Sequence, residues 1–332
     1  MVDIVTGANG YLGNVLVKEL LKRNRKVRAL VRNTSNLKSL ESVIHNSNLE
    51  IVKGDILDLN SLYSAFLDAD AVYHLAGKIT LMPGNRREIY NINYLCTKNV
   101  IQACKECDVK RLIYTSSIHA LTQPPLDKII NEEIPYCISN YKSIYDRSKA
   151  LASVEVLKSV EEHGLDTVIV NPTGIIGPYD FQISALTKTL IDFSTNKLKL
   201  AIEGAYNFVD VRDVAIGHIL AYEKGKKGEN YILSGERITV SQLMNMLEEI
   251  TGVKAPKYYL PANLAKFIAT FMPIYYKITK IKPYFTKYSI DVLLSNSNIS
   301  HEKATRELGY NPRPIKESIR DTISWLKQIG YI

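Results

Sequence analysis

Cysteine is scarce in this sequence. Four cysteines in 332 residues are too few for the disulfide framework of a secreted domain and favour a reducing compartment. Cys104 and Cys107 form one C-x-x-C pair within 99–106, where we expect a helix, and no second pair stands at zinc-binding spacing. We therefore expect ordinary, half-buried helix thiols here and no metal site.

Long apolar runs are lacking as well. Met1 to Val5 run directly into a strand-like segment, without a charged leader and an apolar stretch, so we expect no secretory signal and a cytoplasmic protein. Lysines and prolines interrupt the aromatic segment 256–288, which therefore lacks the ~20 apolar residues of a membrane span. Attachment to a membrane surface stays open. We prefer a mobile lid or pocket wall formed by its aromatic residues, namely Phe267, Phe271, Tyr275, Tyr276, Tyr284 and Phe285.

Positive charge is in modest excess. Lys and Arg total 42 against 34 Asp and Glu, which gives a net charge of +8 and favours anionic ligands such as phosphates. The basic residues are scattered or stand in short runs, without the regular basic and aromatic array of a nucleic-acid-binding module. We expect a small-molecule partner rather than nucleic acid, and leave a homodimer open.

The first half of the chain alternates short apolar runs with amphipathic stretches. The expected strands are 3–6, 26–31, 49–52, 71–75, 111–115 and 167–170, with 230–233 further on, and expected helices begin near Leu12 and cover 97–104 and 141–163. This rhythm predicts an α/β fold, a doubly wound parallel Rossmann sheet. We expect a dinucleotide-binding domain over 1–172, to which 205–235 returns, and a smaller, mostly helical substrate-binding and lid region over 173–204 and 236–332.

Three glycines follow the first expected strand. Gly7, Gly10 and Gly13 lie in TGANGYLG, where a strand ends and a helix begins. Such glycines allow a tight turn, close approach of the backbone to a pyrophosphate, and close helix packing. The free N–H groups at the helix start then face the phosphates. This context predicts a dinucleotide site, with a purely structural turn as the alternative.

Arg32 follows the second expected strand, where a cofactor without a 2′-phosphate normally finds Asp or Glu for its ribose hydroxyls. A guanidinium can bind a phosphate through two parallel hydrogen bonds and can stack on adenine, whereas an acid would repel the phosphate. Ser35 could add a hydrogen bond. These residues favour NADP(H) over NAD(H), unless Arg32 is simply a solvated surface residue.

Tyr145 and Lys149 lie four residues apart in the expected helix 141–163 and so share one helix face. A nearby ammonium would stabilise the phenolate and lower the tyrosine pKa from about 10 towards the range of efficient proton exchange with a carbonyl. The fifth expected strand delivers Ser117 to the carboxyl edge of the sheet, where α/β sheets place their ligands. A hydroxyl there can hydrogen-bond a substrate carbonyl, although strand-end serines also cap turns.

With a glycine turn, a serine and Tyr-x-x-x-Lys in this order, the sequence resembles the extended short-chain dehydrogenase/reductase family over essentially its whole length. The motifs are TGANGYLG, GDI at 54–56, HLAG at 74–77, NYLCTKNV at 93–100 with Cys96 where glycine is usual, YTSS at 114–117, YDRSK at 145–149, NPTGIIGP at 171–178 and FVDVRDVA at 208–215. The resemblance implies cofactor contacts from Gly7, Asn9, Gly10, Tyr11, Leu12, Gly13, Arg32, Ser35, Asp55, Ile56, Leu75, Ala76, Gly77, Thr115, Tyr145, Lys149, Pro172 and Ile175.

Within that family the sequence is most similar to the dihydroflavonol-4-reductase-like and 3β-hydroxysteroid-dehydrogenase-like branch. The similarity lies in LVR at 30–32, NPTGIIGPYD at 171–180 and the ending ELGYNPRPIKESIRDTISWL. It implies an NADPH-dependent reductase of an aldehyde or ketone on an apolar or aromatic substrate. Ser117 and Tyr145 would bind the substrate oxygen, Tyr145 would donate the proton, Lys149 would tune it, and the nicotinamide would deliver hydride.

Two departures from related enzymes bear on the reaction. Ile118 and His119 stand where sugar-nucleotide dehydratases carry an Asp-Glu pair, which argues against elimination of water. Lys78, after HLAG, could meet a substrate anion or solvent, and His119 could assist the site indirectly or pack in its loop. A nucleotide-sugar epimerase with retained NAD is the main rival, and a non-catalytic NADP-sensing protein, which would be expected to lack Tyr or Lys, is the other.

Overall fold

Seven parallel strands form the central sheet, in the order β10-β6-β5-β4-β1-β2-β3. Their bounds are β1 Val2–Thr6, β2 Lys26–Val31, β3 Leu49–Lys53, β4 Ala71–His74, β5 Arg111–Thr115, β6 Thr167–Pro172 and β10 Asn230–Leu233. The computed structural model describes residues 1–79, 85–139, 141–279 and 286–332, with side chains described outside 273–285. Every expected strand is present within two residues, so the predicted α/β fold class is confirmed.

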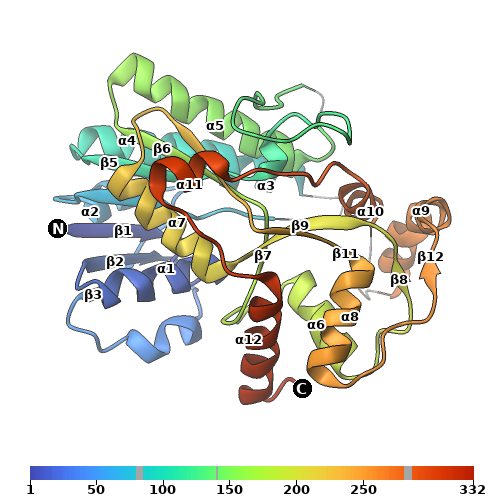
Figure 1. The fold of residues 1–332 in the computed structure, drawn as a ribbon. Coiled ribbons are helices and arrows are strands. Elements are labelled where there is room, and N and C mark those ends of the chain that lie inside the picture. The colour runs from blue at the N-terminus through green and yellow to red at the C-terminus, as the bar shows by residue number, and fades with distance from the viewer. Residues whose placement is uncertain (80–84, 140, 280–285) are drawn as a thin grey trace.

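Helices cover both faces of this sheet (Figure 1). On one face lie α1 Tyr11–Lys22, α7 Val211–Lys224 and α11 Glu302–Leu308; on the other lie α2 Leu59–Phe66, α4 Cys96–Glu106 and α5 Ile144–His163. Fully buried residues such as Leu16 and Ile219 on the first face, and Leu62 and Val156 on the second, each contribute about 1.5–3 kcal/mol on leaving water. This double layer fixes the carboxyl edge of the sheet as a rigid platform.

Helix α5 begins later than the sequence suggested. The hydroxyl of Ser143 accepts a hydrogen bond from the Asp146 N–H, and the Asp146 carboxylate accepts one from the Ser143 N–H, so this capping box starts the helix at Ile144 rather than 141. Gly164, at φ 68°, ends the helix in the left-handed conformation that glycine adopts without strain.

A second, three-stranded sheet of order β11-β9-β7 lies beyond the carboxyl ends of the parallel strands (Figure 1). Its strands are β7 Gly174–Ile176, β9 Ala205–Asp210 and β11 Glu236–Thr239. Helices α6 Ala185–Ser194, α8 Val240–Thr251 and α12 Ile315–Gln328 share an apolar core with it. The sequence did not predict this sheet, because its strands are short and are stabilised by pairing between segments far apart in the chain.

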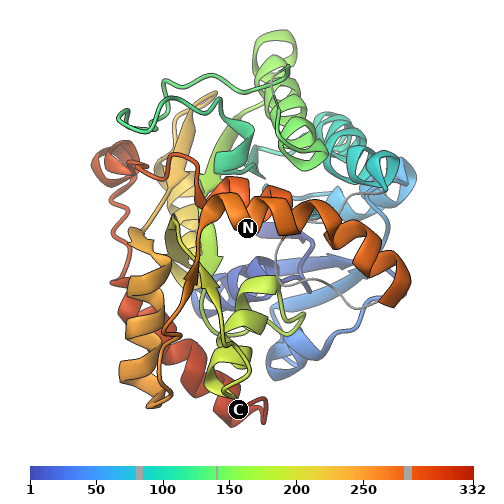
Figure 2. The ribbon, with the colours of Figure 1, turned by 90° about the vertical axis from the view of Figure 1, so that its right-hand side faces the viewer.

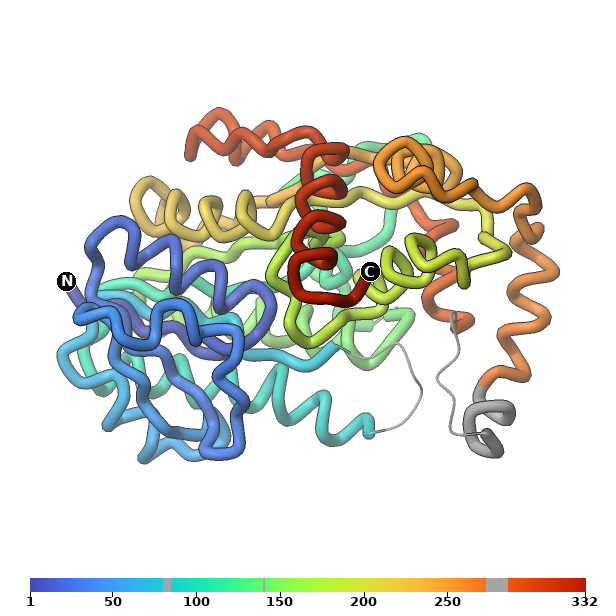
Figure 3. The backbone as a smooth tube through the Cα atoms, turned by 90° about the horizontal axis from the view of Figure 1, so that it is seen from below, coloured from blue at the N-terminus to red at the C-terminus, as the bar shows by residue number. Residues whose placement is uncertain are grey.

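The end of the molecule far from the N-terminus is formed by β8 Ala201–Ile202, β12 Tyr259–Leu260, α9 Ala262–Thr279 and α10 Lys287–Leu293 (Figure 3). Figure 2 shows α9 crossing the front of the molecule when that end faces the viewer. Short elements complete the chain, namely η1 Lys38–Val43, α3 Arg86–Tyr90, η2 Asn91–Leu95 and η3 Ile118–Ala120. Among the described residues, no helix combines the length and apolar character needed to cross a bilayer.

Candidate functional site

The glycine turn between β1 and α1 is too tightly packed for larger residues. Gly7 has a φ of 69°, and a Cβ at Gly13 would lie 2.1 Å from the Gly7 carbonyl oxygen and 2.9 Å from the Cα of Ala8. Gly10 stands at the N-cap of α1, and within the described chain no side chain caps that helix start. The first N–H groups of α1 are therefore available to an anion, as a dinucleotide pyrophosphate requires.

Substituting Gly13 should disrupt this turn. Because the added methyl of Gly13→Ala would meet backbone atoms that cannot rotate away, we expect a loss of about 1–3 kcal/mol of unfolding free energy and at least about tenfold weaker NADPH binding. Chemical denaturation and cofactor titration measure the two effects. Gly252→Ala is the control: its φ is 76° but its Cβ would meet nothing within 4 Å, so NADPH affinity should not change. Unaltered NADPH affinity in Gly13→Ala would remove the turn from the cofactor site.

The strand-four motif lies against the glycine turn. A Cβ at Gly7 would be 2.9 Å from the Cα of Ala76, and the Ala76 N–H donates to the Thr6 hydroxyl at 3.2 Å. That hydroxyl also contacts Nδ1 of His74 at 2.8 Å. Burial lowers the pKa of His74 to about 3, so its ring is a neutral partner in this network. The network holds Leu75, Ala76 and Gly77 at the carboxyl edge of the sheet.

The loop after β2 is also tied to the glycine turn. Nδ2 of Asn9 donates to the carbonyl of Asn36 at 3.2 Å, and the Ser39 hydroxyl donates to the carbonyl of Asn9 at 3.0 Å. Arg32 is exposed in this loop, and its carbonyl accepts from the Ser35 N–H at 2.9 Å. The predicted 2′-phosphate residues therefore lie in a loop that touches the phosphate turn.

The remaining predicted contacts come from two further loops. The Asp55 carboxylate, after β3, accepts from the Leu57 N–H at 2.9 Å, and Asn99 donates to the carbonyl of Ile56 at 3.1 Å. The Tyr11 hydroxyl donates to the Gly177 carbonyl at 2.6 Å and so ties the loop after β7 to the start of α1. The other contacts predicted in this region lie at the end of β6 (Pro172), within β7 (Ile175) and against the core under α1 (Leu12).

Tyr145, Lys149 and Ser117 converge where β5 ends. The Lys149 ammonium donates to the Thr115 carbonyl at 2.5 Å and to the Tyr114 hydroxyl at 3.3 Å. A Cβ at Gly77 would lie 3.8 Å from the same Nζ, which places Lys149 beside the strand-four motif. The Ser117 side chain lies close enough to the Tyr145 hydroxyl to lower its pKa. All three groups are buried, so water is largely excluded from them.

Burial changes the proton affinities of this pair in a way the sequence did not indicate. Desolvation raises the pKa of Tyr145 to about 12, despite the opposing effect of Ser117, and it lowers the pKa of Lys149 to about 7. The expectation that Lys149 would lower the Tyr145 pKa is therefore not met. Tyr145 is a neutral phenol at neutral pH, which is the form that donates a proton.

The buried Lys149 should leave a signature in stability against pH. Its pKa is about 7 in the folded state against 10.5 in the unfolded chain. Between those values the unfolded chain binds a proton that the folded chain lacks, so folding stability rises with pH. The free energy of unfolding of the wild type relative to Lys149→Met should increase by about 1.4 kcal/mol per pH unit in this window. Denaturant titrations at several pH values measure this difference.

Lys158 provides the control, because it lies on the same helix but is exposed. The difference between the wild type and Lys158→Met should not vary with pH over that range. An equally flat difference for Lys149→Met would show that Lys149 keeps its ordinary pKa in the folded protein.

Asn93 lies in the motif at 93–100, but the sequence analysis gave this residue no role of its own. Its side chain accepts from the Lys78 N–H at 2.8 Å and donates to the Lys78 carbonyl at 3.0 Å and to the Ser148 hydroxyl at 3.0 Å. Ser148 in turn donates to the Tyr145 carbonyl at 2.8 Å. Asn93 thereby joins the loop after β4 to α5. The Lys78 ammonium, whose role was open, pairs with Glu88 at 2.5 Å.

An aromatic wall of His119, Tyr206 and Tyr288 stands beside Tyr145. Nε2 of His119 is 2.6 Å from the Tyr206 hydroxyl, and the two rings are nearly coplanar. The Tyr288 hydroxyl, from α10, donates to Asp146 at 2.6 Å, and its ring lies 6.2 Å from the His119 ring. Burial lowers the pKa of His119 and keeps it uncharged. Sequence reasoning named only His119, because the tyrosines come from elements 60 or more residues away in the chain.

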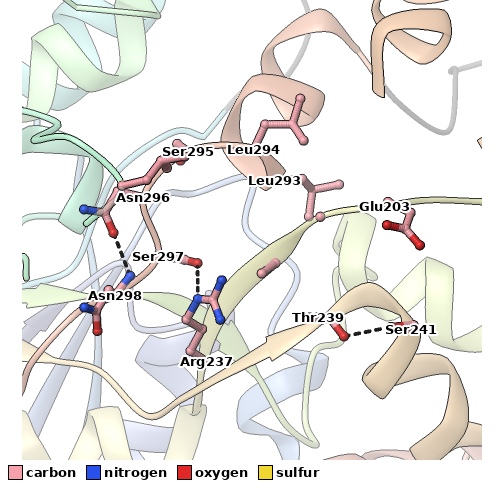
Figure 4. A pocket seen from close by; sticks show the side chains of 13 residues that line it. Glu203, Arg237, Thr239, Ser241, Leu293, Leu294, Ser295, Asn296, Ser297 and Asn298 are labelled. Carbon is pink, nitrogen blue, oxygen red and sulfur yellow. Dashed lines mark hydrogen bonds between the residues drawn. The ribbon is translucent and has the colours of Figure 1, made fainter. Parts of the chain in front are cut away.

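A separate polar cavity of about 560 Å³ lies on the other face of the small sheet (Figure 4). Its lining includes Ala205 and Arg237, and Nε of Arg237 donates to the Ser297 hydroxyl at 3.0 Å. Successive strand residues point to opposite faces, so Ala205 faces this cavity while Tyr206 faces His119. The cavity is thus distinct from the cluster around Tyr145.

The two cysteines of the C-x-x-C pair are free thiols. Cys104 is buried and Cys107 half-buried on and after α4, and neither forms a disulfide. Burial raises the pKa of both thiols, which makes them poor nucleophiles. Among the described residues, no group of three or more His, Cys, Asp or Glu side chains is placed to hold a metal ion.

A doubly wound parallel sheet, a glycine turn and a Tyr-Lys pair of α5 that lies against the end of β5 together define a nicotinamide-dinucleotide-dependent protein of the extended short-chain dehydrogenase/reductase type. The chain belongs to the 3-beta hydroxysteroid dehydrogenase/isomerase family, which it matches over residues 4–241. The predicted resemblance is therefore confirmed at the level of the family.

Several curated relatives match nearly the whole chain. Sterol demethylase protein B of Methylococcus capsulatus is 33% identical over 100% of both chains, and a putative dihydroflavonol 4-reductase of Synechocystis is 30% identical over 99% of this chain and 95% of its own. Among solved structures, the crystal structure of gox2253 has a TM-score of 0.87 and 33% identity over 100% of this chain and 99% of its own.

Proposed function

We propose that this protein is an NADPH-dependent reductase that converts an aldehyde or ketone on a large apolar substrate into an alcohol. The observation that carries the proposal is the convergence of Ser117, Tyr145 and Lys149 at the carboxyl edge of the sheet, beside Gly77 and the glycine turn. The cradle at Gly7 and Gly13, which a Cβ would fill, fits a dinucleotide pyrophosphate.

The cofactor would be held along the carboxyl edge from the β2 loop to β7. Arg32 and Ser35 would take the 2′-phosphate, the start of α1 the pyrophosphate, and Lys149 the nicotinamide ribose. When bound, the nicotinamide supplies the hydride that reaches the carbonyl carbon. On this proposal residues 1–172 with 205–235 serve the cofactor, and 173–204 with 236–332 serve the substrate.

The residues around the carbonyl would manage its oxygen. Ser117 and Tyr145 donate hydrogen bonds to it, and as the carbon accepts hydride, the Tyr145 O–H bond breaks and its proton passes to the oxygen. The raised pKa of Tyr145 keeps the proton on the phenol until the carbonyl oxygen receives it. Lys149, protonated below about pH 7, stabilises the phenolate that remains.

The aromatic wall favours an apolar substrate. His119 is neutral, and Tyr206 and Tyr288 already use their hydroxyls in hydrogen bonds, so the rings offer apolar surface next to Tyr145. The names of the two relatives, a sterol demethylase protein and a dihydroflavonol reductase, refer to polycyclic, largely apolar compounds. We therefore place steroid-like and aryl ketones first among candidate substrates.

Turnover with a panel of carbonyl compounds tests the proposal. Purified protein should consume NADPH faster than NADH with at least one aryl or alicyclic ketone, and it should release no tightly held cofactor on denaturation. A protein that is purified with bound NAD, ignores added NADPH and interconverts nucleotide sugars would be an epimerase. NADPH binding without turnover of any carbonyl compound would instead indicate a sensing protein.

A further inference from the structure

Helix α9 presents an apolar face to solvent. Leu264, Phe267 and Phe271 are exposed by 48%, 65% and 51%, and their i, i+3, i+7 spacing places them on one side of the helix. The two phenylalanine rings pack edge to face, 5.4 Å apart. The opposite side, with Ala265 and Ala269, is buried against a small cluster that includes Ile290 of α10. The two phenylalanine rings are therefore turned towards solvent.

The sequence also predicted four further aromatic residues of this segment as part of a lid or pocket wall. The side chains of Tyr275 and Tyr276 and the whole of Tyr284 and Phe285 lie outside the described residues. Tyr288, which follows them on α10, does reach the catalytic cluster.

Every charged residue in the sequence around α9 is a lysine. Residues 250–290 contain seven lysines and no Asp, Glu or Arg, so this stretch accounts for seven of the eight net positive charges of the chain. Two of the lysines are neutralised from just outside the stretch, Lys254 by Glu248 at 2.7 Å and Lys266 by Asp291 at 2.8 Å. By sequence, the stretch that contains this exposed helix face therefore carries a net positive charge.

We propose that the Leu264–Phe267–Phe271 face of α9 binds the surface of an anionic lipid bilayer. Aromatic and aliphatic side chains on one helix face enter the boundary between headgroups and acyl chains, while nearby lysines attract anionic headgroups. A second copy of this chain fits poorly, because a symmetric dimer through this face would bring the same excess of lysines together. A soluble polyanion would match the lysines but leave the phenylalanines without a partner.

Because of where α9 lies, a bound bilayer would also affect how the substrate reaches the site. This step rests on the proposed reductase function. Helix α9 packs on α10 through the Lys266–Asp291 ion pair and the Ala269 side of the helix. Helix α10 supplies Tyr288, which hydrogen-bonds Asp146 next to Tyr145. A bilayer held at α9 would thus adjoin the aromatic wall, and an apolar ketone dissolved in lipid would reach the site without crossing water.

Vesicle flotation of the full chain tests the lipid contact without any assay of activity. Wild-type protein should float with phosphatidylcholine vesicles that contain phosphatidylglycerol, float much less with phosphatidylcholine alone, and lose binding as salt rises. Phe267→Asp with Phe271→Asp should reduce binding at least about tenfold, since two apolar rings are lost from the lipid phase. Its thermal midpoint and NADPH affinity should stay at the wild-type values, which shows that the variant is folded.

Leu67→Asp is the matched control, because Leu67 is 60% exposed at the end of α2, near the opposite end of the molecule, and should leave flotation unchanged. Absence of binding to either vesicle, or equal binding by the double variant, overturns the proposal. So does a double variant that changes the oligomeric state in lipid-free buffer, because the face would then join subunits. Loss of flotation with intact ketone reduction in solution separates this contact from the proposed catalysis.

Discussion

Tyr145→Phe should lower kcat for ketone reduction by about 10²- to 10⁴-fold, the range that a positioned general acid contributes. The substitution removes one oxygen from a buried ring and leaves the packing of α5 intact. The affinity for NADPH should change little, because the loss falls on the proton that the carbonyl oxygen receives. Steady-state kinetics with a saturating ketone and a separate NADPH titration measure the two quantities.

Tyr94→Phe is the matched control for this variant. Tyr94 also touches α5, through a 3.3 Å hydrogen bond to Glu155, but it lies away from Ser117 and Lys149. Loss of the Tyr94 hydroxyl should cost only about 0.5–1.5 kcal/mol of stability. Because this hydroxyl does not act on the substrate, kcat should stay within about twofold of the wild-type value. Full activity in Tyr145→Phe would exclude Tyr145 as the proton donor.

Arg32→Asp should reverse the cofactor preference. The exposed Arg32 lies in the loop that Asn9 and Ser39 tie to the phosphate turn, where a carboxylate would repel a 2′-phosphate and accept from ribose hydroxyls. Loss of charge-assisted hydrogen bonds, worth about 1.5–3 kcal/mol each, predicts at least about a hundredfold change in the ratio of NADPH to NADH affinities. Titration of both cofactors measures this ratio.

Two further variants separate attraction from repulsion at that position. Arg32→Gln should weaken NADPH binding without improving NADH binding, because it removes the guanidinium and adds no acid. Arg23→Asp changes an exposed arginine at the other end of α1, whose guanidinium pairs with Glu19 at 3.1 Å, and should leave the ratio unchanged. If wild-type protein binds both cofactors equally, Arg32 has no part in cofactor choice.

The parallel sheet could be predicted from sequence because its central strands, such as β4, β5 and β6, are short apolar runs buried on both faces. The glycine turn could also be predicted. Only glycine fits at Gly7 and Gly13, because a methyl group there would meet backbone atoms, and this requirement leaves a recognisable glycine pattern in the sequence. The small sheet could not be predicted, because β7 has three residues and pairs with β9 some 30 residues later. Tyr206 and Tyr288 were missed for the same reason: only tertiary contacts bring them to His119.

The electrostatics of the site could not be predicted, because the pKa shifts depend on burial. From sequence, the spacing of Tyr145 and Lys149 suggested a lowered tyrosine pKa. The structure buries both groups and directs the Lys149 ammonium to the Thr115 carbonyl, so desolvation dominates each shift. Which side of α9 the phenylalanines occupy likewise depends on tertiary packing, because the buried Ala265 and Ala269 anchor the other side of the helix.

Transfer of deuterium from NADPH to a ketone tests the central claim most directly. NADPH that carries deuterium in place of both hydrogens at the reactive carbon of its nicotinamide should yield an alcohol with one deuterium on the former carbonyl carbon, detected by mass spectrometry. Tyr145→Phe should yield the same labelled alcohol far more slowly, because hydride donation stays intact while proton donation is lost. An unlabelled alcohol, or no alcohol from any ketone while bound NAD supports sugar epimerisation, would contradict the account.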